Sequence, residues 1–333
     1  MRFSYPIYFV YKNKTHGITD GLTEIDPNAN PERFKTGEDC WILQTFLYLK
    51  QKGYSNIYLV SDIVPGQICV IHYWELATKD RSYRSFIIAI QADTPLAPLA
   101  NIRVVQNKLR LASNFDCYIT HWPQPGLIPR NSARSSTIKN IAYIGHPDYL
   151  AAEFKSEFFK DQLAKIGVSL LIKESDWNDY SNVDLVLAVR DISAFDISGK
   201  PPSKLINAWK AGCPALMGPD PAYQQLRKDD LDYIEVYSAE NAYDAVHRLI
   251  EKPKLYKAML NRCLARSDEF TIKTISRQWE ELFFGMVSLE YERYLDKQRG
   301  FKKIMPFMKF IVLAIKHKAE RKAFFRLIHK PVV

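Results

Sequence analysis

Residues 184–223, DLVLAVRDISAFDISGKPPSKLINAWKAGCPALMGPDPAY, contain the pattern that decides the fold. An apolar run of strand length is followed by a polar loop and then by Leu205, Ala208 and Trp209 at the spacing of one helical face. A second apolar strand, PALMG, comes directly after this helix. Strand, helix and strand in this order predict a βαβ unit of a parallel sheet with helices on both faces.

The residues at the start of this helix predict an anion-binding site. We expect Ser203 to cap a helix that begins at Lys204 and ends at Gly212. The first N–H groups of a helix lack internal partners and lie at the positive end of its dipole, and Lys200 and Lys204 add full charges. A phosphate-bearing ligand is therefore the first hypothesis. The alternative is that both lysines are solvated at a helix start that binds nothing.

The segment 200–223 resembles the donor-binding segment of GT-B fold glycosyltransferases, of the retaining group that takes a sugar from a nucleotide diphosphate. In that pattern a helix carries a glutamate, a small residue and an Ala-Gly pair, and a strand beginning with proline follows. Six residues stand at its positions: Asn207, Ala208, Ala211, Gly212, Cys213 and Pro214. The two glutamates of the pattern are absent, because Gly199 and Asn207 stand in their places.

The resemblance implies an α/β fold of two Rossmann-like domains that face each other across a cleft, with the donor sugar near residues 220–223. Positive groups would stabilise the leaving diphosphate without a metal. Asn207 would contact the ribose, and Gly145, after the apolar run IKNIAYI, would let the backbone approach the phosphates. The nucleotide sugar is then a co-substrate, and no cofactor is expected. The predicted donor-binding residues are Gly145, Arg190, Lys200, Ser203, Lys204 and Asn207.

The chain has 333 residues, of which 47% are hydrophobic, enough to fill the cores of two domains. Three prolines in THWPQPGLIPR and the polar run NSARSST mark a boundary. We predict an N-terminal domain over residues 1–135, a donor domain over 136–285 and a basic amphipathic helical tail over 286–333. The chain has no glycine-rich dinucleotide fingerprint and no P-loop, which argues against hydride transfer and ATP hydrolysis by those routes.

The first half contains apolar runs of strand length, namely YPIYFV, NIYLV, ICVIH, SFIIAIQAD, IRVVQN and DCYITHW. Polar residues that follow the strands of a parallel sheet line its binding crevice. Asp93 and His72 are therefore the predicted catalytic residues. Either one would act as the general base if the reaction inverts the anomeric centre. Asp62 and His121 are further candidates at strand ends. The alternative for each residue is a turn-forming or structural role.

Cysteine usage and the absence of long apolar runs predict a cytoplasmic protein. The five cysteines are scattered and odd in number, which is typical of reduced thiols. The opening residues MRFSYPIYFVYKNK have a short apolar run broken by Pro6, and predict a strand in place of a signal peptide. No run has the length that a membrane span needs.

The formal net charge is +9, and much of the excess lies at the end of the chain. Residues 300–333 contain nine lysines and arginines and one acid, Glu320. These basic residues alternate with apolar ones in two predicted helical pieces around Pro306. Such a pattern predicts that residues 300–330 contact an anionic membrane surface, at the inner face of the membrane. The alternative is a terminal helix packed on its own domain. The preceding helix, 276–299, is expected to return to the first domain.

Together these patterns predict hexosyl transfer from a nucleotide diphosphate sugar to a polysaccharide, lipid-linked or other cell-envelope glycan. A nucleotide-sugar epimerase of the same fold is one alternative, but it should carry acidic pairs in the cleft. A non-catalytic protein that binds nucleic acid or membrane is another. No nucleic acid is expected as a partner, because the lysines cluster at one terminus without aromatic residues interleaved along a groove. The nucleotide, sugar, acceptor, stereochemistry and oligomeric state stay open.

Overall fold

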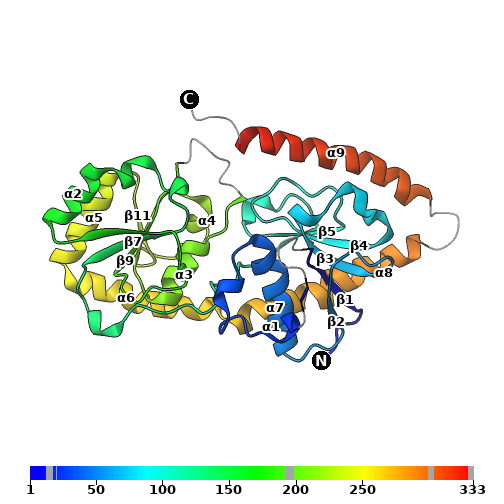
Figure 1. Cartoon of the computed structure of the whole chain (residues 1–333), viewed down its shortest axis with the longest axis horizontal. Helices are drawn as coiled ribbons and strands as arrows, with labels where there is room; N and C mark the ends of the chain where they lie inside the picture. Colours follow the sequence, from blue (N-terminus) through cyan, green and yellow to red (C-terminus); the bar gives the residue numbers. More distant parts are fainter. Residues whose placement is uncertain (13–17, 20, 192–198, 299–303, 329–333) are drawn as a thin grey trace. The chain divides into compact units, whose positions relative to one another are not determined.

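The computed structural model describes residues 1–12, 18–19, 21–191, 199–298 and 304–328 (Figure 1). Contacts divide the chain into two compact units. The first unit comprises Met1–Trp122, Ser198–Pro201 and Ile272–Val333, and the second comprises Pro123–Ile197 and Pro202–Thr271. The chain thus leaves the first unit after Trp122, returns to it briefly at Ser198–Pro201 and returns finally at Ile272. The predicted boundaries follow residues 135 and 285.

The first unit is built on a parallel sheet with the strand order β2-β1-β3-β4-β5-β6, in which Ile68 pairs with Phe86 across β3 and β4. Every residue of β3 and β4 is buried, as expected for a parallel sheet that is covered on both faces. All the apolar runs predicted as strands in the first half are strands. They are β1 (Ile7–Val10), β2 (Ile57–Val60), β3 (Ile68–His72), β4 (Phe86–Ile90), β5 (Ile102–Val105) and β6 (Asp116–Tyr118).

Helices from both ends of the chain cover one face of this sheet. Trp41, Phe46, Trp279 and Phe283 pack with the strands in one core. The expected return of the late helices to the first domain is therefore confirmed. The helices are the π-helical turn η3 (Asp39–Leu43), α1 (Gln44–Gln51), α7 (Ile272–Leu282), the π-helical turn η13 (Phe283–Val287) and α8 (Ser288–Lys297).

The helix α9 (Ile304–Ile328) covers the other face. Phe310, Leu313 and Ala314 pack against the buried side chains of β3 and β4, and His317 donates its Nε2–H to the carbonyl oxygen of Leu76 (3.0 Å). The tail therefore packs on the first unit. None of the helices in the described ranges combines the length and the apolar character that a bilayer crossing requires.

The prediction of two helical pieces around Pro306 is wrong, because α9 is one helix. Pro306 is the third residue of the helix. Backbone N–H groups in the first turn have no intrahelical partner, so a proline there removes no hydrogen bond and does not break the helix.

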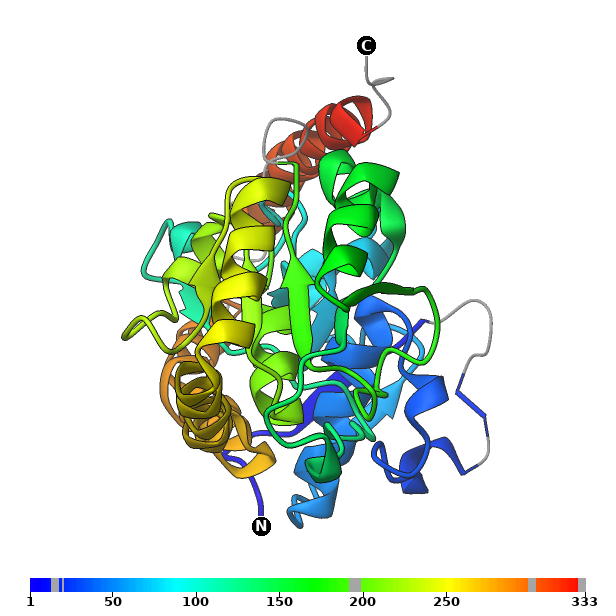
Figure 2. The same ribbon diagram turned by 90° about the vertical axis from the view of Figure 1, so that its left-hand side faces the viewer.

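The second unit is built on a parallel sheet with the order β11-β10-β9-β7-β8, with helices on both sides of its strands (Figure 2). α2 and α5 pack on one face, α3 packs on the other, and α6 contributes to both cores. The strands are β7 (Asn140–Ile144), β8 (Ser169–Lys173), β9 (Leu185–Ala188), β10 (Ala215–Met217) and β11 (Ile234–Glu235). The helices are α2 (Glu157–Lys165), α3 (Ser203–Ala211), α4 (Pro221–Gln224), α5 (Ala239–Glu251) and α6 (Pro253–Ser267).

Helix α2 begins at Glu157, after the two short turns that follow β7. Ser156 has an extended backbone, and its hydroxyl accepts a hydrogen bond from the N–H of Phe159 (3.2 Å), which fixes the start of the helix there. Short 3-10 turns connect the other elements: η1 (Leu22–Glu24), η2 (Pro31–Arg33), η4 (Tyr73–Glu75), η5 (Thr78–Asp80), η6 (Ser82–Arg84), η7 (Lys108–Arg110), η8 (Ser132–Arg134), η9 (Pro147–Tyr149), η10 (Ala152–Lys155) and η12 (Asp268–Phe270).

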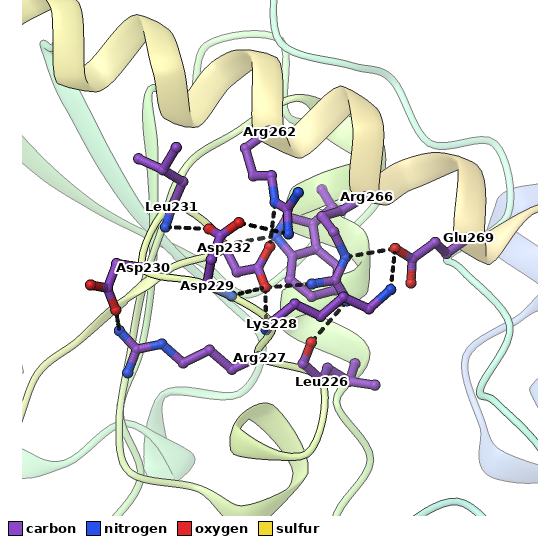
Figure 3. Close-up of polar contacts among 11 residues, drawn as sticks. Leu226, Arg227, Lys228, Asp229, Asp230, Leu231, Asp232, Arg262, Arg266 and Glu269 are labelled. Atoms are coloured by element: carbon purple, nitrogen blue, oxygen red, sulfur yellow. Dashed lines mark hydrogen bonds and ion pairs between the residues drawn. The ribbon is translucent and has the colours of Figure 1, made fainter.

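The buried carboxylate of Asp232 fastens α6 to the loop before β11 (Figure 3). Its Oδ1 accepts from Nε of Arg262 (2.7 Å), and its Oδ2 accepts from Nη1 of Arg266 (2.5 Å) and from the N–H of Lys228 (2.6 Å). Burial alone would raise the pKa of Asp232, but these hydrogen bonds outweigh it and lower the pKa. The Arg266 guanidinium also lies 4.1 Å from the centre of the Trp209 ring.

We expect Asp232→Ala to destabilise the protein by about 3–5 kcal/mol, because the buried Arg266 guanidinium loses its buried carboxylate and keeps only Glu269, which is partly exposed. Urea unfolding measures this loss. The matched control is Asp230→Ala, since Asp230 is exposed and its pair with Arg227 lies at the surface. Equal stability of the two variants would contradict the structural role of Asp232.

Candidate functional site

The turn after β7 brings a glycine and a lysine together in the second unit. Gly145 has a φ of +140°, which side-chain-bearing residues rarely adopt. Lys204, from the first turn of α3, donates its Nζ–H to the carbonyl oxygen of Ile144 and lies 4.6 Å from the centre of the Tyr143 ring. A Cβ atom at position 145 would collide with the Lys204 ammonium. The close approach of the lysine to the turn therefore requires glycine.

The Lys204 ammonium is poised to respond to an anion. Burial, and then the nearby Arg190 guanidinium, lower the pKa of Lys204 to about 7. A negative ligand at this place would raise that pKa again, since an opposite charge favours the charged form. Together with the start of α3, the residues form a place at which phosphate can be bound.

Arg190, after β9, forms an ion pair with Asp220, which follows β10. Asp220 also caps α4, because its Oδ1 accepts from the N–H of Ala222 (2.9 Å). The Arg190 guanidinium lies 5.8 Å from the centre of the Tyr223 ring, whose buried hydroxyl has no hydrogen-bond partner within the described part of the chain. Since β7, β9 and β10 are neighbours, these groups gather at the carboxyl edge of the sheet, where open α/β sheets bind ligands.

The structure also places the predicted donor residues Ser203 and Asn207. Ser203 does not cap α3 as predicted, because it is already the first helical residue and Pro202 occupies the N-cap position. Asn207 accepts a hydrogen bond from the N–H of Gln124 (2.9 Å) through its Oδ1. The prediction that Gly212 ends the helix is confirmed, since it has φ +69° at the C-cap.

Lys200 and the predicted catalytic residues Asp93 and His72 lie in the first unit. Lys200 Nζ lies 2.5 Å from Oδ2 of Asp93; burial alone would raise the pKa of Asp93, but this lysine outweighs it and lowers the pKa. His72 is buried, with Nδ1 3.2 Å from Oε1 of Glu38. The structure thus gathers Gly145 and Lys204 with Arg190, but places Lys200 beside Asp93.

A cavity of about 700 Å³ opens in the first unit and contains polar residues that the sequence analysis does not single out, apart from Asp62. Lys12 lies two places after the end of β1, and Trp74 and Glu75 lie two and three places after the end of β3. Their positions just beyond the strand ends are the sequence signal that could have identified them. Arg321 reaches the cavity from α9, which no local pattern indicates. Among the described residues, no group of His, Cys, Asp or Glu side chains is arranged to hold a metal ion.

Comparison with known proteins identifies the fold. No protein-family model and no curated protein sequence matches the chain. The chain is similar to HepE of Anabaena in complex with UDP and glucose, with 12% identity, a TM-score of 0.51, and coverage of 83% of this chain and 98% of HepE. The HepE complex with UDP-glucose gives a TM-score of 0.51 at 11% identity, with the same coverage.

Sucrose-phosphate synthase from Thermosynechococcus elongatus gives a TM-score of 0.45 at 12% identity, over 74% of this chain and 72% of that protein. The predicted GT-B fold, with two Rossmann-like domains, is confirmed.

We expect Gly145→Ala to cost about 1–3 kcal/mol of stability, through backbone strain and displacement of the Lys204 ammonium. The control Gly167→Ala has a φ of +72° and open space around its Cβ, so it reports the cost of a left-handed backbone without a collision. In a Lys204→Ala background the penalty at position 145 should fall, with a coupling of about 0.5–3 kcal/mol in urea unfolding. Strict additivity would show that Lys204 does not contact the turn.

Proposed function

We propose that the protein is a metal-independent glycosyltransferase that takes a hexose from a nucleotide diphosphate sugar. The observation that carries this proposal is the partly buried Lys204 ammonium beside the Gly145 turn and Arg190. The GT-B fold supports it, and so do the UDP and UDP-glucose in the HepE structures, since this chain spans 98% of HepE.

In the proposed reaction the bond between the anomeric carbon and the diphosphate breaks, and negative charge develops on the leaving oxygens. Three positive groups are in place before this charge appears: Lys204, Arg190 and the first N–H groups of α3. Because they need not reorganise during the reaction, they stabilise the developing negative charge effectively. Asn207 would join the donor site only by exchanging its present partner, the N–H of Gln124, for the ligand. Lys200 belongs to the first unit, where it pairs with Asp93.

The acceptor that we propose is a polysaccharide, lipid-linked or other cell-envelope glycan, reached from the cytoplasmic face of the membrane. Support comes from the outer face of α9, where Met308, Ile311, Val312 and Ile315 recur at helical spacing with exposed fractions of 40–66%. Exposed basic side chains surround them: Lys309, Lys316, Lys318, Lys322 and Arg326. Apolar side chains among lysines match the interface of an anionic bilayer. Residues 300–303 and 329–330 of the predicted membrane element lie outside the described residues.

This helix is not amphipathic in the predicted way, with one apolar and one polar face. Its first half is apolar on both the packed and the outer side, and most of its basic residues follow in the second half. Packing on the sheet uses one apolar face, and a second apolar face is left exposed.

We expect one nucleotide among UDP, GDP, ADP, CMP and dTDP to stabilise the protein by roughly 2.7 kcal/mol at about 100 times its dissociation constant. Thermal unfolding measures the shift. It should be lost in Lys204→Ala and kept in Lys210→Ala, which removes a lysine from the last turn of the same helix.

The affinity for that nucleotide should also fall as the pH rises from 6 to 8.5. The free protein loses the Lys204 proton near pH 7, and the diphosphate binds the protonated form. Lys204→Ala should flatten this dependence. A wild-type protein that responds to no nucleotide would overturn the proposed function.

We expect the protein to sediment with vesicles of phosphatidylglycerol and phosphatidylcholine, and to bind less to phosphatidylcholine alone. Val312→Ser with Ile315→Ser should weaken binding at least tenfold, because each buried aliphatic side chain contributes about 1.5–3 kcal/mol. The control is Leu264→Ser, which removes an exposed leucine from α6 of the second unit. Equal binding by both variants would contradict the role of α9.

A further inference from the structure

An acidic residue beyond the end of β10 is held in one conformation by the prolines on either side of it. Residues 218–221 read GPDP. A residue before proline favours extended backbone, and Asp220 has φ −83° and ψ 125°. Its N–H donates to the carbonyl oxygen of Gly218 (2.7 Å), and its own carbonyl oxygen accepts from the N–H groups of Tyr223 (2.9 Å) and Gln224 (3.1 Å). These contacts fix the backbone of Asp220.

The pairing of β9 and β10 brings Asp220 next to Arg190. The two strands are parallel neighbours, and Arg190 and Asp220 follow their last residues by two and three places. Beyond the ladder, the N–H of Gly218 donates to the carbonyl oxygen of Ala188 (2.9 Å), and a Cβ atom at position 218 would lie 3.0 Å from Cγ1 of Val189. The close approach of the strand ends therefore depends on this glycine.

The carboxylate of Asp220 contacts two groups at once. Its Oδ1 accepts from the N–H of Ala222 (2.9 Å) at the start of α4, and its Oδ2 pairs with Nη1 of Arg190. Because the first contact keeps the carboxylate from turning, the second holds the guanidinium in one place. A guanidinium carries five N–H donors, so pairing through Nη1 lets its other nitrogens donate to an anion.

The place that Arg190 occupies is unfavourable for a cation without a negative charge nearby. Its side chain is only 13% exposed, and burial and then Arg190 lower the pKa of Lys204, which shows that the two cations repel each other. Tyr143 and Tyr223 also lie close to Arg190, but burial raises the pKa of both phenols, that of Tyr223 to about 12, so both are neutral near pH 7. Asp220 supplies the charge that offsets the repulsion.

We propose that Asp220 is the positioning residue of the anion site: it holds the Arg190 guanidinium beside the Lys204 ammonium, so that both cations meet the diphosphate of the nucleotide. This role rests on the proposed function. Asp220 acts through Arg190 and does not contact the ligand, because a carboxylate repels a diphosphate. Without Asp220, repulsion by Lys204 moves the guanidinium away, and the diphosphate loses one of its cationic partners.

The first measurement is the affinity, by isothermal titration calorimetry, for the nucleotide among UDP, GDP, ADP, CMP and dTDP that stabilises the wild-type protein. Asp220→Asn keeps an oxygen for the N–H of Ala222 but offers Arg190 no charge, so it should weaken binding about tenfold. Arg190→Gln should weaken it at least as much. In the Arg190→Gln background, Asp220→Asn should cause no further loss. The control Asp161→Asn removes an exposed carboxylate of α2 and should bind like wild type.

The second measurement is the pH dependence of that affinity, which a weaker cap of α4 alone would not move. Burial and Arg190 hold the pKa of Lys204 at about 7, so wild-type affinity falls above this pH. When Arg190 moves away, the pKa of Lys204 rises, and the fall should begin at a higher pH in Asp220→Asn and Arg190→Gln alike. The ionisation of the nucleotide is common to all variants, so a difference between the profiles reports the protein. Other titratable groups on the strands and loops around Lys204 are Tyr143, His146, Asp148, Tyr149, Asp191 and Tyr223.

The melting temperature shows whether Asp220→Asn folds, since this variant leaves a buried guanidinium without its carboxylate. If it does not fold, Arg190→Gln is compared with the double variant that also carries Asp220→Asn, in which neither partner of the ion pair stays charged. Absence of a further loss of affinity in the double variant supports the role, and a further loss overturns it.

The outcomes separate the two proposals. A wild-type protein that binds no nucleotide overturns the proposed function and this role with it. Nucleotide binding that Lys204→Ala abolishes, but that Asp220→Asn leaves unchanged or tightens, overturns the role of Asp220 alone. A pH profile of Asp220→Asn that matches wild type overturns it too, and so does an equal loss of affinity in Asp161→Asn.

Discussion

Both sheets are parallel, and a parallel sheet has to be covered on both faces because its strands are apolar on both. This requirement explains the course of the chain. The first unit takes α1 and α7 on one face and α9 on the other, so that β3 and β4 are buried throughout. Polar residues are then left to the carboxyl edges of the strands, which is where Gly145 and Arg190 lie in the second unit.

Buried charges in this protein fall into two kinds. Asp232, and likewise Asp184 with Arg134 (2.5 Å), are carboxylates surrounded by arginines and backbone N–H groups. They stay charged because these hydrogen bonds and positive charges lower their pKa. Lys204 and Glu75 form the second kind. Burial lowers the pKa of Lys204 and raises the pKa of Glu75, so in each case it favours the neutral form. Groups held away from their ordinary charge state cluster at functional sites.

The sequence predicts what depends on local periodicity. Apolar runs locate the six strands of the first unit and β7, β9 and β10 of the second, and α3 lies where Leu205 and Trp209 indicate a helix. The resemblance to GT-B glycosyltransferases is what places Lys204 and Gly145 in one predicted site, and the structure brings the two residues together. The sequence does not predict that Lys200 faces Asp93, nor that Arg321 borders the cavity beside Glu75, since these contacts join segments far apart in the chain. Desolvation, which sets the pKa of Glu75, also arises only from the folded surroundings.

Helix α9 connects the surface of the first unit with its interior. Phe310 and Leu313 contribute to the core, Arg321 borders the cavity, and Val312 and Ile315 remain exposed on the outer side. Packing alone explains the first group but not the last, because two isoleucine- and valine-rich turns exposed to water cost free energy that polar residues would avoid. A bilayer in contact with the outer side would remove this cost. Under the membrane contact proposed above, the cavity that Arg321 borders would lie close to the bilayer surface.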